Sequence, residues 1–390
     1  MKYKGKSMRF IIYCWLLISV ASVTAGDLEE MYKSPKTKSM TADEFMKNYP
    51  NFKWQGVNKR VAISKKSLLF NHKIREAIVY FSAQGKLTRM DAWIYNRGDD
   101  GNMAKKQFET KYEALLDELT KYFEVRKPKK SGIDGVTRST AYAFQMANRH
   151  EVKLLVGFDK KPYRADFLNL VIRNYEDKDR ITSRVATGFI SKSDNGDVFI
   201  DKIPMIDQGP KGYCVPATLA RIGQHFGVDV SMHEIAMLAD SSSGGGTSSR
   251  QAMEALKDKY ARMRLNIKEI KFKYPFNVYN IKSPKQAEGH LGSLKENDRN
   301  VKKFFGLVKK QVDKGYIVAW TMIVGLLPEN GKPARQGGGG HMRMIMGYNE
   351  KTNELIFSDS WGNGHEIKRI DAASAMLVSS GIYEIRPASR

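Results

Sequence analysis

The side chain best suited to chemistry in this sequence is the thiol of Cys214. It lies six residues after Gln208, and apolar residues recur at helical spacing in the segment that follows it: Val215, Leu219, Ile222 and Phe226. A helix N-terminus supplies partial positive charge and free N–H groups, which favour a thiolate over a thiol. Pro216 suits the first helical turn, because the N–H that proline lacks has no helical partner there. Cys214 is therefore a candidate nucleophile.

The other cysteine of the chain, Cys14, lies in an N-terminal segment with the features of a secretory signal peptide. Basic residues precede an apolar run from Phe10 to Val23, which is too short to span a membrane comfortably. Val23 and Ala25 are small residues at the spacing that signal peptidases recognise. We therefore predict a leader of residues 1–25 and a secreted or periplasmic protein, with an uncleaved anchor as the alternative.

Removal of the leader leaves Cys214 without a disulfide partner. An unpaired cysteine in an oxidising compartment is expected to be either buried or reactive. A buried structural thiol is thus the alternative to a nucleophile. The remaining residues, roughly 365, are enough for two hydrophobic cores without disulfide support.

The charge of the chain indicates anionic partners in a general way. The formal net charge is +23, and it falls to +19 once the four basic residues of the leader are removed. Basic and acidic residues are interspersed, and no pattern typical of a nucleic-acid-binding motif is present. We favour a solvated basic surface, able to associate with an anionic envelope, over a specific nucleic-acid site.

The first half of the chain has the pattern of an α+β domain. Residues 26–39 are expected to be mobile, and residues 41–174 are expected to form an N-terminal domain of unknown role. Its one predicted helix runs from Met103 to about Phe123, where apolar residues recur at helical spacing. Short apolar runs bounded by turn residues predict the strands: Arg60 to Ser64, Ile74 to Ser82, Leu87 to Tyr95, Ala141 to Met146, Glu151 to Gly157 and Phe167 to Ile172.

Residues 175–193 are charged and turn-rich, and we predict that they form a linker, with an ordered connector as the alternative. Residues 194–390 form a second predicted α+β region, in which helices come first and strands last. The predicted helices are Cys214 to Gly227, about His233 to Leu238 after a Ser231 cap, Arg250 to Tyr260 and about Asn300 to Lys314. The predicted strands are Ile317 to Val324, His341 to Tyr348 and Glu354 to Ser358.

A cysteine nucleophile in hydrolysis needs a base, a group that orients the base, and donors for the developing oxyanion. His225 shares a helix face with Cys214 but lies about 16 Å along the axis, too far to act on it. Four other histidines lie in the N-terminal domain or lack neighbouring partners in the sequence: His72, His150, His233 and His290. His341 follows four glycines and opens an apolar strand, where a side chain can face a cleft. It is our candidate base, with His365 in reserve.

Asp359 is the candidate for the orienting group. It follows the strand that is joined to the His341 strand by the turn Asn349 to Asn353. If the two strands form a hairpin, the end of the second returns beside the start of the first, which places Asp359 next to His341. A carboxylate there can hold the imidazole ring and favour its charged form. Trp361 is apolar enough to shield this contact from water.

Together these segments resemble a known family. DQGPKGYC, with Gln208 and Cys214, is similar to the glutamine-to-cysteine segment of papain-like cysteine peptidases. GGGGHMRMIMGY and SDSWG resemble the histidine strand and the Asn-Ser-Trp-Gly segment of that family. The resemblance is greatest to the bacterial C39-like branch, which commonly uses aspartate as its third catalytic member. It covers about residues 194–390.

The resemblance implies a papain-like domain with Cys214 as nucleophile, His341 as general acid/base and Asp359 as its orienter. It also implies that Gln208 donates its side-chain amide to the oxyanion beside the backbone N–H of Cys214. Two positions depart from papain proper: Val215 replaces a tryptophan, and Asp359 replaces an asparagine. Neither change removes a catalytic group, but both weaken inference about substrate.

The expected activity is therefore hydrolysis of a peptide or isopeptide bond in a peptide or protein substrate. An amide transferase of transglutaminase type and a non-catalytic binding module on a peptidase fold are the alternatives. Neither clustered metal ligands nor a glycine-rich phosphate loop is present, so no metal or cofactor is expected. Substrate specificity, the role of the first domain and the oligomeric state stay open.

Overall fold

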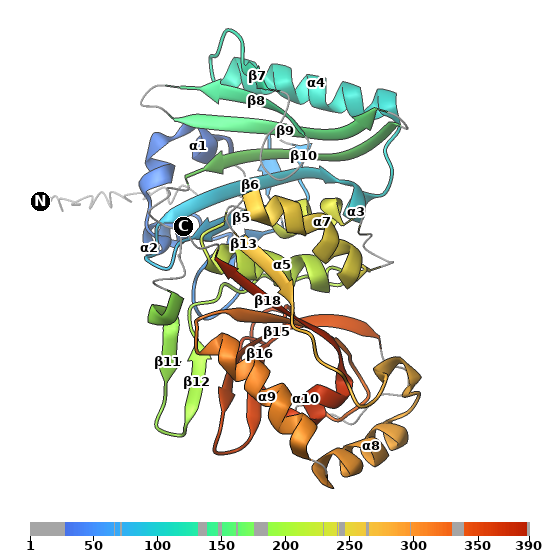
Figure 1. Ribbon diagram of the computed structural model, residues 1–390. Helices are drawn as coiled ribbons and strands as arrows, with labels where there is room; N and C mark the ends of the chain where they lie inside the picture. Colours follow the sequence, from blue (N-terminus) through green and yellow to red (C-terminus); the bar gives the residue numbers. More distant parts are fainter. Residues whose placement is uncertain are drawn as a thin grey trace, which may run out of the picture.

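Two large antiparallel sheets and the helices between and around them make up the chain (Figure 1). The computed structural model describes residues 28–65, 67–70, 72–131, 139–146, 150–160, 163–174, 186–228, 230–239, 241, 246–262, 265–296, 298–329 and 339–387. The predicted signal peptide and residues 175–185 of the predicted linker lie outside these ranges. No helix of the described part is both long and apolar enough to cross a membrane.

The first sheet has the strand order β1-β2-β5-β6-β10-β9-β8-β7. Two antiparallel meanders meet in it where β6 pairs with β10. The strands are β1 (Lys53–Trp54), β2 (Val61–Ser64), β5 (Glu76–Phe81), β6 (Leu87–Asn96), β7 (Lys129–Ser131), β8 (Ser139–Gln145), β9 (Glu151–Lys160) and β10 (Tyr163–Arg173), with a small hairpin of β3 (Leu68–Leu69) and β4 (His72–Lys73) beside them. The helices of this half are α1 (Leu28–Lys33), η1 (Pro35–Ser39), α2 (Ala42–Asn48), α3 (Arg97–Asp100) and α4 (Lys105–Tyr122).

The expectation that residues 26–39 are mobile is wrong for the part of that segment that the structure describes. Residues 28–39 form α1 and η1, and Leu28, Met31 and Tyr32 are buried. Tyr32 donates its hydroxyl hydrogen to the carbonyl of Leu170 at 2.8 Å. Apolar residues three and four apart on one short helix thus attach this segment to the first sheet.

Both faces of the first sheet are covered. Every residue of β5 is buried, and its side chains divide between two hydrophobic clusters. Ala77, Val79 and Phe81 pack in the cluster that contains α4, whereas Ile78 and Tyr80 belong to the cluster that contains the C-terminal half. Because alternate residues of a strand point to opposite faces, a strand in which every residue is buried must be covered on both. A separate N-terminal domain is therefore not confirmed, since one face of the first sheet packs in the same cluster as the C-terminal half.

The second sheet has the order β11-β12-β15-β14-β18-β13, with β16 paired to β15 and β17 paired to β16. Its strands are β11 (Ile190–Lys192), β12 (Asp197–Ile200), β13 (Leu265–Glu269), β14 (Ile317–Ile323), β15 (Gly340–Asn349), β16 (Glu354–Ser358), β17 (Lys368–Asp371) and β18 (Ser379–Pro387). Its helices are η4 (Ala186–Phe189), α5 (Cys214–His225), α6 (Met232–Leu238), α7 (Ser249–Arg262), η5 (Val278–Asn280), α8 (Pro284–Glu296), α9 (Asp298–Val312) and α10 (Ala372–Val378).

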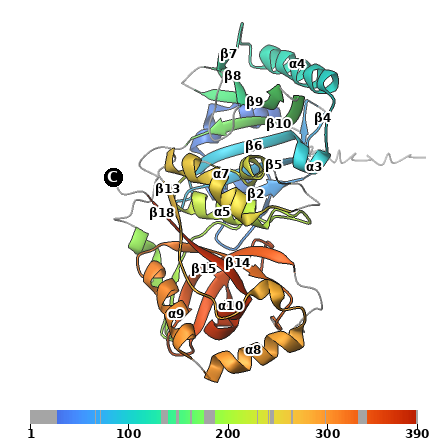
Figure 2. The same ribbon diagram turned by 45° about the vertical axis from the view of Figure 1, so that its right-hand side comes forward.

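Helices α5 and α7 lie between the two sheets in both views, whereas α8, α9 and α10 lie on the far side of the second sheet (Figures 1 and 2). Buried ion pairs cross the junction at α6. Glu234 accepts from Arg89 of β6 at 2.8 Å and from Arg173 of β10 at 3.0 Å. The junction is thus polar as well as apolar, and the buried carboxylate of Glu234 is paired with two arginines.

His233 of α6 corrects one sequence-based expectation. It does have polar partners, because its ring contacts the carboxylate of Glu76 through Nε2 and lies 3.7 Å from Asp99 through Nδ1. Both partners come from the first sheet and its α3 helix, far away in the sequence. Burial disfavours the charged carboxylate, but His233 and then Lys211 outweigh it and lower the pKa of Glu76 to about 2.

Candidate active site

Cys214 is the first residue of α5, where the sequence predicted a helix to begin. No side chain caps this end of the helix, so its first N–H groups remain available. The thiol is half-buried and is the free cysteine of the described part of the chain. Backbone N–H groups of Val215 and Met342 donate to its sulfur. The helix end therefore surrounds the sulfur with donors that stabilise a thiolate.

Two polar residues of α5 lie on the same face as Cys214, and the sequence analysis did not name them as site residues. Thr218 and Arg221 follow Cys214 at helical spacing, on the same face. Thr218 donates its hydroxyl hydrogen to the carbonyl of Met342 at 3.2 Å, so it joins the helix to β15. Arg221, which is fully buried, donates to the carbonyl of Asp359 at 2.8 Å. These two residues fix the helix against both strands of the site.

The β15 and β16 strands form the hairpin that the turn predicted. Met344 is paired with Ser358, which brings the end of β16 beside the start of β15. As a result, Nε2 of His341 donates to Oδ1 of Asp359 at 2.8 Å. Both side chains are almost fully removed from solvent. The juxtaposition of His341 and Asp359 therefore follows from local strand pairing, as expected.

His341 also contacts the thiol of Cys214, so three groups form one hydrogen-bonded chain. Burial opposes the charged imidazole, but hydrogen bonds to Asp359 and Cys214 and their negative charges raise the pKa of His341 to about 8. Burial likewise opposes the thiolate, yet His341 and the two backbone donors bring the pKa of Cys214 below its ordinary value. The geometry thus favours a thiolate–imidazolium pair near neutral pH.

Asp359 is held on its other oxygen by two cations. Nε of Arg343 donates to Oδ2 at 2.8 Å, and Nζ of Lys368 lies 3.5 Å away. Burial alone would raise the pKa of Asp359, but His341, Arg343 and Lys368 hold it well below the usual range. Glu329 accepts two hydrogen bonds from Arg343 at 2.9 Å and one from Lys368 at 3.1 Å, which balances the two cations.

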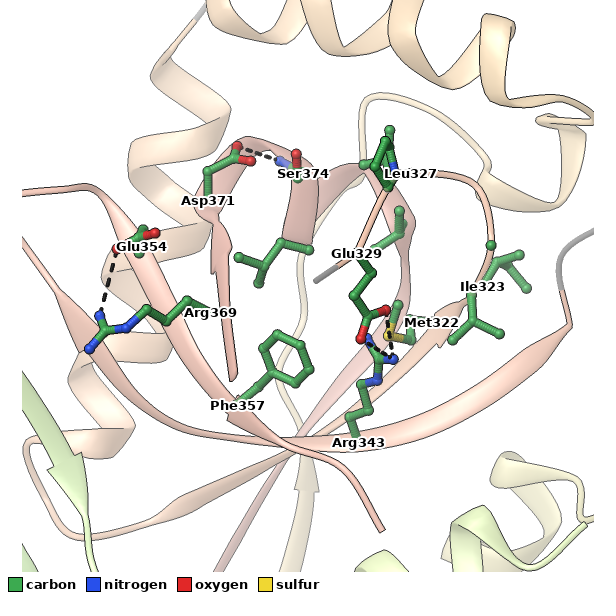
Figure 3. A pocket seen from close by; sticks show the side chains of 15 residues that line it. Met322, Ile323, Leu327, Glu329, Arg343, Glu354, Phe357, Arg369, Asp371 and Ser374 are labelled. Atoms are coloured by element: carbon green, nitrogen blue, oxygen red, sulfur yellow. Dashed lines mark hydrogen bonds and ion pairs between the residues drawn. The ribbon is translucent and has the colours of Figure 1, made fainter. Parts of the chain in front are cut away.

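This charged cluster borders a cavity of about 260 Å³. Figure 3 shows Arg343 and Glu329 paired on its wall, near Phe357 and Met322. The remaining wall is mixed: residues 323–328 and α10 contribute mainly apolar groups, whereas Glu354, Arg369 and Asp371 contribute charged ones. Because the ion pair separates the cavity from Asp359, the carboxylate itself does not line it.

Trp361 covers the imidazole. Its ring stacks on that of His341, with 4.9 Å between centroids and 28° between planes. Nζ of Lys368 lies 4.8 Å from the Trp361 centroid, and Arg343 lies 5.4 Å from it. The indole remains 39% exposed. It therefore occupies the solvent side of the His341 ring, the place that the sequence assigned to it.

Gln208 lies outside any helix or strand, beside the segment that carries Asp359 and Ser360. Its backbone N–H donates to the carbonyl of Ser360 at 2.9 Å. Its side-chain Nε2 donates to the carbonyl of Lys211 at 3.0 Å, and its Oε1 is buried without a hydrogen-bond partner. One N–H of the amide is thereby used to hold the side chain, and the other remains available for a ligand.

The remaining histidines of this half do not join the chain of contacts. His225 is buried at the opposite end of α5 against Phe189, and burial lowers its pKa to about 3. The ring of His365 meets the edge of Trp361, 5.5 Å between centroids, and its carbonyl accepts from the N–H of Asp359. His365 thus supports Trp361 and Asp359, whereas His341 contacts the thiol. Within the described ranges, no group of three or more potential ligands is placed to hold a metal ion.

Residues 200–384 match the model of the peptidase C39-like family. No relative among the curated proteins matches the chain. Two solved structures are similar to part of it. The peptidase domain of Streptococcus ComA, a bi-functional ABC transporter involved in quorum sensing, is 14% identical, with coverage of 48% of this chain and 100% of that one and a TM-score of 0.27. Xylellain, a cysteine protease from Xylella fastidiosa, is 11% identical, with coverage of 56% and 95% and a TM-score of 0.29.

The family match lies entirely within the region that resembled papain-like peptidases in its sequence, and it includes Gln208, Cys214, His341 and Asp359. It supports a cysteine peptidase. The resemblance drawn from the sequence is therefore confirmed for this region: residues 200–384 match the peptidase C39-like family.

Proposed function

We propose that this protein is a cysteine peptidase that hydrolyses peptide or isopeptide bonds through an acyl-thioester on Cys214. The observation that carries the proposal is the buried chain of hydrogen bonds from the Cys214 thiol through His341 to Asp359. A helix N-terminus, an imidazole and a carboxylate in this order are the parts that thiol catalysis requires.

In the proposed reaction, the Cys214 thiolate attacks the carbonyl carbon of the substrate and forms a tetrahedral oxyanion. The side-chain amide of Gln208 and the backbone N–H of Cys214 donate to that oxygen. The His341 imidazolium then gives its proton to the leaving amine, and the carbon–nitrogen bond breaks. Neutral His341 next takes a proton from water, whose oxygen attacks the thioester and releases the acid and the thiol.

Asp359 keeps the His341 ring in the tautomer and orientation that this sequence of proton transfers needs. Because Arg343 and Lys368 keep Asp359 ionised, it stabilises the positive imidazole at both proton transfers. Export through the predicted signal peptide, residues 1–25, is part of this proposal, as is a peptide or protein substrate.

Alkylation and mutation test the proposal together. We expect iodoacetamide to modify Cys214 of the native protein at about pH 6, because a thiolate is present there. Cys214→Ala and His341→Ala should abolish hydrolysis of a peptide library while the circular dichroism spectrum is kept. Gln208→Ala should retain a residual rate, about 10² to 10³ lower in kcat, since one oxyanion donor is lost.

Two results would contradict this assignment. A thiol that reacts only after denaturation would indicate a structural cysteine. Full activity of His341→Ala together with loss of activity in His365→Ala would show that His365, and not His341, is the base. Added primary amines separate hydrolysis from amide transfer, because a transferase would convert the acyl-thioester into a new amide rather than an acid.

A further inference from the structure

The first sheet contacts the loop that carries the candidate oxyanion donor. This loop, residues 208–213, connects Gln208 to the N-terminus of α5. Helix α3, which follows β6, meets it at two points. Nζ of Lys211 donates to Oδ2 of Asp99 at 2.8 Å, and the Tyr213 hydroxyl lies against Gly98.

The side chain of Gln208 depends on this loop for its orientation. Its amide is fixed by one hydrogen bond, from Nε2 to the carbonyl of Lys211, because Oε1 has no partner in the described part of the chain. Gly209 has a positive φ of 66°, and a second glycine, Gly212, follows Lys211. Glycines leave the backbone free to adopt other conformations. A contact that holds Lys211 in place therefore also holds the Gln208 amide.

The Lys211–Asp99 ion pair is suited to that role. The Asp99 side chain is 1% exposed and that of Lys211 is 15% exposed, so solvent screens the pair weakly. Asp99 also lies 3.7 Å from Nδ1 of His233, which adds a second contact from α6. Lys211 further lies 5.3 Å from the centroid of the Tyr213 ring. The ammonium group is thus bound between a buried carboxylate and an aromatic face.

Gly98 allows α3 to approach the loop this closely. A Cβ added at Gly98 would lie 1.7 Å from the Tyr213 hydroxyl oxygen, which no packed structure accepts. Tyr213 is fully buried and precedes Cys214, so it cannot move away without disturbing the start of α5. The absence of a side chain at Gly98 therefore lets Asp99 reach Lys211.

From these contacts we infer that Asp99 is a positioning residue for the oxyanion site: through Lys211 it fixes the carbonyl that orients the Gln208 amide. This inference rests on the proposed function. It also gives the first sheet a role in catalysis, since a residue outside the matched family region holds a donor inside it.

The test compares Asp99→Asn and Lys211→Met with the full-length wild-type protein. Both substitutions keep side-chain size and remove one charge of the pair. We expect kcat for the best-cleaved library peptide to fall about tenfold to a hundredfold. This loss is smaller than the one expected for Gln208→Ala, because the donor is displaced and not removed. KM should change little. The affinity for an aldehyde made on the same peptide should fall by a similar factor, because its hemithioacetal oxygen occupies the oxyanion site.

Alkylation by iodoacetamide at about pH 6 separates this role from a general structural one. The reaction needs the thiolate and no oxyanion donor, so its rate should stay at the wild-type value in both variants. Lys211→Arg should restore most of kcat, because a guanidinium can still bind Asp99. Asp159→Asn is the matched control: it removes a comparable carboxylate from an exposed pair with Arg164, and it should behave as wild type.

Two outcomes overturn the inference alone. Either kcat and aldehyde affinity are unchanged in Asp99→Asn, or alkylation slows in parallel with hydrolysis, which would mean that the whole site is disturbed. If instead the wild-type protein neither hydrolyses peptides nor binds the aldehyde, the proposed function fails and this inference fails with it.

Discussion

The charge on Asp359 is the residue-level feature that distinguishes this site from one built on asparagine. An asparagine in its place could accept a hydrogen bond from His341 but would bring no negative charge. The imidazolium of His341 would then lose its neighbouring carboxylate, and Glu329 alone would balance Arg343 and Lys368. The carboxylate therefore both orients the ring and neutralises its surroundings.

This leads to a prediction for the pH dependence of activity. Hydrolysis should rise as the Cys214 thiol ionises and fall as His341 loses its proton, near the pKa of about 8 that its partners give it. In Asp359→Asn the imidazolium loses its carboxylate, so its pKa falls and the basic limb should move to lower pH, with reduced activity. Asp359→Ala should be less active still, because nothing orients the ring. A pH series with one fluorogenic peptide measures all three proteins.

Superimposable profiles for the three proteins would contradict this account. Asp359 would then act as a turn residue only, and another group would have to orient His341.

At the scale of elements, α6 is the point where the two sheets are joined by charge. Ser231 caps this helix and Glu234 completes a capping box with it. Glu234 is also the shared acceptor of Arg89 and Arg173. Burial works against the charged carboxylate, but the two arginines together lower the pKa of Glu234. One side chain thus caps the N-terminus of α6 and binds arginines from two strands of the other sheet.

We predict that Glu234→Gln lowers the free energy of unfolding by about 1.5–3 kcal/mol, because Arg89 and Arg173 lose their shared charged acceptor, although Arg89 keeps its pair with Asp91. Glutamine keeps the capping interaction, so the loss reports the charge. Glu254→Gln is the control. Glu254 pairs with Arg250 on an exposed helix face, and its replacement should cost less than about 0.5 kcal/mol. Urea unfolding measures both, and equal midpoints would refute the role of α6.

The elements also show which parts of the site can be predicted from the sequence. The β15–β16 hairpin could be predicted because a short turn sets its register, and that register places Asp359 beside His341. The partners of His233 could not, because Glu76 and Asp99 lie in the other half of the chain. Local patterns report contacts between near neighbours, whereas ion pairs across the junction leave no periodic signal.

Burial explains two further differences. Helix α10 was not predicted, because each of its residues is buried and the segment therefore has no polar face to mark its period. The division into two domains followed from the charged segment 175–193, whereas β5, buried throughout, indicates a sheet covered on both sides. Part of the predicted linker, residues 186–192, forms η4 and β11.

Thr218 and Arg221, in contrast, lie at a helical spacing from Cys214 that could have identified them as site residues.

For the whole molecule, the shared core predicts that the C-terminal half does not fold alone. A fragment of residues 186–390 would expose the part of its cluster that packs against the first sheet, where the ring of His233 lies 4.6 Å from that of Trp93. The fragment would also lack Arg89 and Arg173, the two arginines that bind the carboxylate of Glu234. We expect the fragment to lack a cooperative urea transition, to bind a hydrophobic dye and to have no fast-reacting thiol, whereas the full chain unfolds in one transition. A cooperatively folded, reactive fragment would show that the halves are independent.

The position of β18 bears on when the site is assembled during synthesis. This strand, Ser379–Pro387, lies inside the second sheet between β14 and β13, so β13 and one edge of β14 gain this partner only after residues 379–387 have left the ribosome. The first sheet can form early, as the N-terminal parts of proteins usually do. Cys214 is translated long before His341, and the imidazole reaches it only when β14 and β15 are in place. A nascent chain that has not yet reached β15 therefore carries an ordinary thiol, and synthesis of the His341 strand is the event that turns it into an activated one.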